Sequence, residues 1–138
     1  MSQYNFIASN IKLDSFSYGV QREGHRLYID ESNHLQIFQD ELFEDLTPYT
    51  KASYVQGISF GRKYLGNPEK LLDYIKQALD GQDSLEIFSI WLGEKNEVEK
   101  RDCHIDQLDR ELLKWVFSYG GFKNPRKLKV YKYSRGKK

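Results

Sequence analysis

The stretch SLEIFSIWL, residues 84–92, decides the fold of this chain. In an extended segment, successive side chains point to opposite faces of a sheet. Both faces of this segment are then apolar, with Leu85, Ile87 and Trp91 on one and Phe88, Ile90 and Leu92 on the other. Strands of this kind are typical of the interior of a sheet that is covered on both sides. We therefore expect an interior strand, with helices over one face and N-terminal segments over the other.

Two amphipathic helices flank this strand in the sequence. The first is predicted to have Asn67 as its cap, Pro68 as its first residue and Gly81 as its stop. The second is predicted to have Asp106 as its cap and Gly120-Gly121 as its stop. Their apolar stripes are Leu71, Leu72, Ile75, Ala78 and Leu79 in the first, and Leu108, Leu112, Trp115, Val116 and Tyr119 in the second.

The remaining strands are shorter. We predict strands at residues 4–9 and 53–60, with a bulge at Gly57, a hairpin over residues 26–40, and a last strand at 126–133. Residues 84–105 are predicted to form two strands joined by a tight turn near 94–97. The expected fold is α+β: a single domain over residues 1–138, with a mostly antiparallel sheet of about five to seven strands and two main helices.

From residue 53 onward the predicted order is strand, helix, strand, strand, helix, strand, which matches the βαββαβ order of ferredoxin-like folds. That topology would place the segment EVEKRDC, residues 97–103, at the centre of the sheet. Because this segment is heavily charged, the ferredoxin-like arrangement is only the minor option.

Composition favours a cytoplasmic protein. The chain has 138 residues, one cysteine and 39% hydrophobic residues, so a core can form but an internal disulfide cannot. No apolar run approaches the roughly 20 residues that span a membrane, and the N-terminus lacks the pattern of a signal peptide. We expect no membrane association.

Cys103 and His104 are the first candidates for chemistry. On a strand, these neighbours point to opposite faces and cannot form a thiolate-imidazolium pair, so we interpret Cys103 as a buried structural residue. His25 and His34 bracket a predicted strand and are about 20 Å apart, too far to share an ion. No catalytic residue, metal ligand or cofactor site is predicted from the sequence.

The C-terminal strand carries the clearest signal of an interaction surface. The last 16 residues contain eight Lys or Arg and no acid, although the net charge of the chain is only +1. With Leu128 and Val130 facing the core, the proposed surface comprises Arg126, Lys127, Lys129, Tyr131, Tyr133 and Arg135, followed by a basic tail at residues 134–138. Cations beside aromatic rings suit a nucleic acid. Alternatively, the lysines protect an edge strand from aggregation, or the tail docks on the acidic residues 30–45.

These observations favour a non-enzymatic protein-interaction module whose partner is another protein or a second copy of the chain. The first alternative is a nucleic-acid-binding domain that uses the basic, tyrosine-containing C-terminal strand. The second alternative is an enzyme with a pocket around Cys103.

Overall fold

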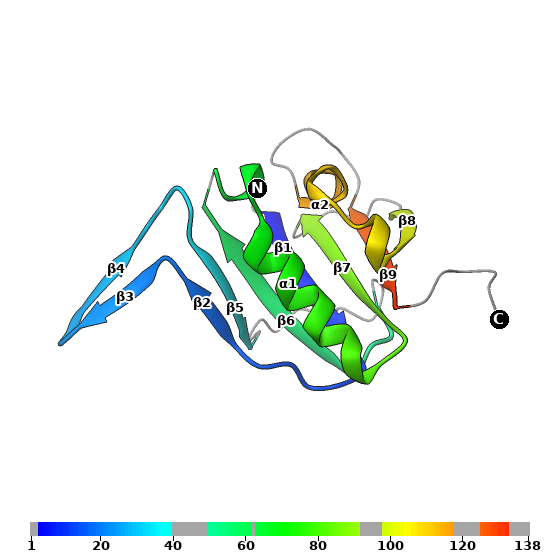
Figure 1. Ribbon diagram of the computed structural model, residues 1–138, viewed down its shortest axis with the longest axis horizontal. Coiled ribbons are helices and arrows are strands. Elements are labelled where there is room, and N and C mark those ends of the chain that lie inside the picture. Colours follow the sequence, from blue (N-terminus) through cyan, green and yellow to red (C-terminus); the bar gives the residue numbers. More distant parts are fainter. Residues whose placement is uncertain (1–2, 40–49, 62, 92–97, 118–124, 133–138) are drawn as a thin grey trace.

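The computed structural model describes residues 3–39, 50–61, 63–91, 98–117 and 125–132. They form a seven-stranded sheet with two α-helices packed on one face, and a two-stranded arm that projects from one end (Figure 1). The sheet order is β2-β5-β6-β1-β7-β9-β8. Its strands are β1 (Gln3–Ser9), β2 (Phe16–Tyr18), β5 (Leu35–Gln39), β6 (Tyr54–Phe60), β7 (Ser84–Trp91), β8 (Glu99–His104) and β9 (Arg126–Tyr131). The helices are α1 (Glu69–Ala78) and α2 (Arg110–Phe117). The prediction of an α+β fold is confirmed.

β7 is an interior strand, as the sequence predicts. It lies between β1 and β9 and pairs antiparallel with both. Leu85 and Ile87 belong to the main core beneath the helices. The opposite face of β7 carries a second, smaller core, made of Phe6, Ala8, Phe88 and Ile90. The side chains of Trp91 and Leu92 lie outside the described residues. β7 is therefore buried on both faces.

The positions of β8 and β9 show that the predicted strand pairing is wrong. Residues 84–105 do not form a hairpin, because β9 lies between β7 and β8 and pairs parallel with β8. The sequence explains this arrangement: Leu128 and Val130 of β9 are fully buried, whereas the charged β8 takes the edge of the sheet. The strand order is consequently not the ferredoxin-like one. The turn predicted near 94–97 lies outside the described residues.

Both helices begin at residues other than those predicted. Pro68 is the N-cap of α1, and the Tyr64 hydroxyl accepts a hydrogen bond from the Leu71 N–H at 2.9 Å in place of an Asn67 cap. Residues Ile105–Gln107 form a separate 3₁₀ turn, and α2 follows it with Asp109 Oδ1 accepting from the Leu112 N–H at 2.9 Å. Asp106 is therefore not the cap of α2. The predicted stop at residues 120–121 lies outside the described residues.

The hairpin predicted over residues 26–40 is wrong in its pairing. β4 (Arg26–Ile29) pairs with β3 (Val20–Glu23), whereas β5 pairs with β2 and β6. The four segments β2 to β5 make one long bent hairpin, whose outer half is the arm, residues 20–29. Its turn is Gly24-His25, and Gly24 has φ +60, the left-handed first position that a type II′ turn requires.

Gly57 does not mark a bulge. Its partners Phe6 on β1 and Phe38 on β5 continue the register of both neighbouring strands without a break. A Cβ at residue 57 would lie 2.5 Å from Cε2 of Phe38. The glycine makes room for the Phe38 ring on the helix-free face of the sheet.

Candidate functional site

Cys103 lies in the main core and is 7% exposed. Burial, and then the neighbouring Asp102 carboxylate, raise the pKa of its thiol to about 11. His104 has other partners: its Nδ1 accepts from the Asp106 N–H at 3.3 Å, and its Nε2 donates to the Lys132 carbonyl at 3.0 Å. The geometry gives Cys103 the properties of a protonated core residue at neutral pH, rather than those of a nucleophile.

Because the pKa of the Cys103 thiol is raised in the folded chain, we expect the stability of the protein to depend on pH. In the unfolded chain the thiol ionises near pH 9, whereas in the folded chain it stays protonated to about pH 11. Between these values the unfolded state binds fewer protons, so stability falls as the pH rises. Between pH 8.5 and pH 10.5, the free energy of unfolding measured with urea should fall by about 2 kcal/mol more for the wild type than for Cys103→Ala. Equal losses in the two proteins would contradict a buried neutral thiol.

The predicted C-terminal surface is divided between the two faces of the sheet. Arg126 lies on the helix side, where its Nη1 donates to the Trp115 carbonyl at 2.8 Å and its guanidinium lies 5.1 Å from the Trp115 ring centre. Lys127, Lys129 and Tyr131 alternate with the buried Leu128 and Val130 and lie on the opposite, helix-free side. Tyr133, Arg135 and the tail at residues 134–138 lie outside the described residues, as do four of the six acids within residues 30–45.

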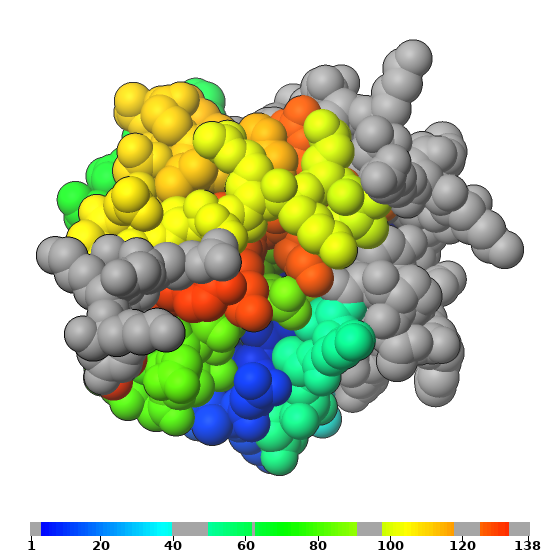
Figure 2. Space-filling model, turned by 90° about the vertical axis from the view of Figure 1, so that its right-hand side faces the viewer, coloured from blue at the N-terminus to red at the C-terminus, as the bar shows by residue number. Residues whose placement is uncertain are grey.

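The helix-free side carries a shallow depression with a volume of about 340 Å³, which we call the lysine depression. It lies where β8, β9 and β7 meet the end of β1 and the segment before β6 (Figure 2). Four cations line it, from three different parts of the chain: Lys51, Lys100, Lys127 and Lys129. The fold thus adds Lys51 and Lys100 to two residues of the predicted surface.

Carboxylates offset part of this charge. Glu86 Oε2 lies 2.9 Å from Lys127 Nζ, and its other oxygen accepts from the Thr50 hydroxyl. Lys129 has Glu86 and Asp102 as its partners on the two neighbouring strands. Because opposite charges on adjacent strands stabilise a sheet, part of this lysine cluster is structural. β9 is an inner strand, so the interpretation that its lysines protect an edge is wrong.

The arm is the most exposed part of the described structure. β3 and β4 pair only with each other, and Figure 1 shows them projecting away from the layers of sheet and helix. Three consecutive large side chains are exposed there: Leu27 by 50%, Tyr28 by 46% and Ile29 by 41%. A two-stranded ribbon has no core of its own and is marginally stable in water. The exposed apolar residues therefore lie on a ribbon that neither core covers.

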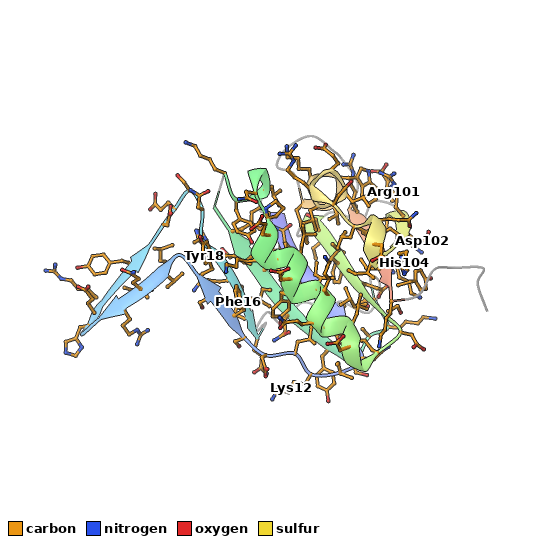
Figure 3. The ribbon with its side chains drawn as sticks, viewed as in Figure 1. Lys12, Phe16, Tyr18, Arg101, Asp102 and His104 are labelled. Carbon is orange, nitrogen blue, oxygen red and sulfur yellow. The ribbon has the colours of Figure 1, made fainter. Side chains whose placement is uncertain are left out.

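The base of the arm is firmly held. Gly19 has φ +72, and its carbonyl accepts from the Asp30 N–H at 2.8 Å. Asp30 Oδ1 accepts from the N–H groups of Ser32 and Asn33. Tyr18, which Figure 3 shows at the junction of the arm and the body, has the Lys70 ammonium 5.6 Å from its ring centre. These contacts fix the direction in which the arm projects.

Sequence reasoning missed the arm, although a signal was present. The segment VQREGHRLYI, residues 20–29, has a glycine at its centre with short runs of strand-forming residues on either side. A two-residue turn that begins with glycine is a recognised hairpin pattern. The hairpin was instead predicted over residues 26–40, with the apolar segment LQIFQD, residues 35–40, as its second strand.

Comparisons with protein-family models, curated proteins and solved structures found no match to this chain. None of the helices in the described ranges is long and apolar enough to cross a membrane. Within the same ranges, no group of three His, Cys, Asp or Glu side chains is placed to hold a metal ion.

Proposed function

We propose that this chain is a non-enzymatic protein-interaction module that binds its partner through the arm, residues 20–29. The observation that supports this proposal is the exposure of Leu27, Tyr28 and Ile29 on a ribbon that lies apart from both cores. Each of these side chains would gain free energy when an apolar surface covers it. A strand edge beside them offers main-chain hydrogen bonds to an extended partner segment.

The experiment is partner capture from a nuclease-treated lysate with matched variants. In an antiparallel pair, Leu27 and Ile29 share one face of the arm, and Tyr28 lies on the other face opposite Gln21. We expect Leu27→Lys/Ile29→Lys to abolish capture and the control Asn67→Lys/Gln77→Lys, two exposed positions outside the arm, to retain it. Both variants should keep the wild-type melting temperature, since all four side chains are exposed. Equal capture by the two variants would overturn the proposal.

A second candidate function is binding of single-stranded nucleic acid, and the specific observation that favours it is the lysine depression. Lysines from three parts of the chain converge there, with the Lys129 ammonium 5.2 Å from the Tyr131 ring centre. Such a surface would follow a phosphate backbone. The carboxylates of Glu86 and Asp102 weaken it, so this candidate ranks second.

Salt dependence tests the second candidate. If Lys51 and Lys100 each neutralise a phosphate, Lys51→Ala/Lys100→Ala should lower the slope of log K against log salt by about 1.4 for single-stranded RNA or DNA. The control Lys63→Ala/Lys76→Ala, outside the depression, should leave the slope unchanged. Absence of binding by the wild type at low salt, measured by fluorescence anisotropy, would rule out this function.

A further inference from the structure

The free edge of β4 has a defined set of main-chain groups. The Asp30 N–H donates to Gly19, and the register pairs Gln21 with Tyr28. In an antiparallel ladder, residues alternate between pairs that exchange hydrogen bonds and pairs that do not. The N–H and C=O groups of Tyr28 therefore point toward β3. Those of Leu27 and Ile29 point outward, to the edge that no described strand covers.

The side chains along this edge are self-complementary. The segment HRLYIDE, residues 25–31, has two basic-type residues at one end, two acids at the other, and Tyr28 at its centre. When this segment pairs antiparallel with itself about Tyr28, Arg26 lies opposite Asp30 of the second copy. His25 lies opposite Glu31, and Leu27 lies opposite Ile29. Opposite charges and apolar residues on facing strands stabilise such a pair.

From this we infer that the partner of the arm is a second copy of the chain, bound by antiparallel pairing of the two β4 strands about Tyr28. The inference rests on the proposed function and names the partner. A two-fold axis passes through Tyr28, as an isologous dimer requires. Leu27 and Ile29 of the two copies, whose main-chain groups point outward, then form the hydrogen-bonded pairs, and the two ribbons become one four-stranded sheet.

The register follows from the same residues. The two nearest alternative registers move the two-fold axis from Tyr28 to Leu27 or to Ile29, so that this residue lies opposite its own copy. In one of these registers Ile29 then faces His25, and in the other Leu27 faces Glu31. Both lose the ion pairs between Arg26 and Asp30. The register about Tyr28 keeps the charge pairs and the apolar pairs together, with Val20 beside Ile29 on the same face of the widened sheet.

A cysteine on the two-fold axis tests both the dimer and its register. Facing residues of a non-hydrogen-bonded pair have Cα atoms about 4.5 Å apart, within the range of a disulfide. Tyr28→Cys should therefore form an intermolecular disulfide in mild oxidant. In the control Gln21→Cys, the substituted residue is the partner of Tyr28 on β3 and lies off the axis, so the yield of intermolecular disulfide should be about tenfold lower. The native Cys103 is buried and should not interfere.

Charge reversal is the second test, measured by sedimentation of the full chain. Wild type should sediment as a dimer. Glu23→Arg/Arg26→Glu, which keeps opposite charges facing each other within the arm, should raise the dimer Kd by about tenfold, because two attractive pairs between the copies become repulsive. Arg22→Glu, a charge reversal on β3 alone, should alter the dimer Kd by less than about twofold.

Two outcomes would overturn the inference: a monomeric wild type without cross-linking of Tyr28→Cys, or equal cross-linking of Gln21→Cys. A monomer whose arm still captures a different protein would overturn the dimer alone. Loss of both dimer formation and arm-dependent capture would overturn the proposed function as well.

Discussion

Phe88→Ala is expected to cost about 3–5 kcal/mol of unfolding free energy, enough to unfold a domain of ordinary stability. Phe88 is 1% exposed and lies on β7 with its ring stacked on Phe6, the ring centres 5.2 Å apart. Truncation would leave a cavity between Phe6 and Ile90 on the helix-free face of the sheet. Because β1 and β9 both pair with β7, they cannot close this cavity without losing their own register. Urea unfolding monitored by circular dichroism measures the loss.

Phe38→Ala is the matched control for this prediction. It removes the same ring from the same face of the sheet, but Phe38 is 44% exposed and lies over Gly57 near the other end. We expect a cost of less than about 1 kcal/mol. Equal costs for the two variants would show that the small core around Phe88 contributes no more than surface contacts do.

Much of the sheet could be predicted from sequence, because its core strands have simple patterns. SLEIFSIWL is apolar on both faces and is an interior strand, and Leu128 and Val130 alternate with lysines and are buried as expected. Strand order was harder to predict. The charge of β8 favours an edge position, but its parallel pairing with β9 depends on where α2 carries the chain, and no local pattern in β8 indicates that pairing.

The candidate surfaces were predictable only in part, for the same reason. Lys127 and Lys129 could be placed on one face by alternation, but Lys51 and Lys100 join them through the fold. Arg126 belongs to the same basic run. Because it is the neighbour of Lys127 on a strand, its side chain points to the opposite face of the sheet, where it contacts Trp115. The arm was missed because its two strands bury little surface, so their apolar residues show no contrast between a core face and a solvent face.

Gly61→Ala is expected to destabilise the protein by about 3 kcal/mol, at the upper end of the usual cost of overpacking. A Cβ at residue 61 would lie 2.3 Å from the Ser32 carbonyl carbon and 2.4 Å from its oxygen. The cost is steric, since the φ of Gly61 is not in the left-handed region. The Ser32 carbonyl cannot easily move aside, because it accepts from the Lys63 N–H at 2.8 Å.

The same substitution should also affect the arm. Ser32 follows Asp30, whose carboxylate accepts from the Ser32 N–H and fixes the chain where β4 ends. Displacement of Ser32 should therefore speed hydrogen exchange at residues 30–34, beyond the loss of global stability. Gly66→Ala is the control, because a Cβ there meets nothing within 4 Å and its φ is not left-handed either. Its stability should stay within about 0.5 kcal/mol of wild type. If Gly61→Ala were equally mild, the segment before β5 would have to be free to move away from residue 61, and the arm would not be fixed at its base.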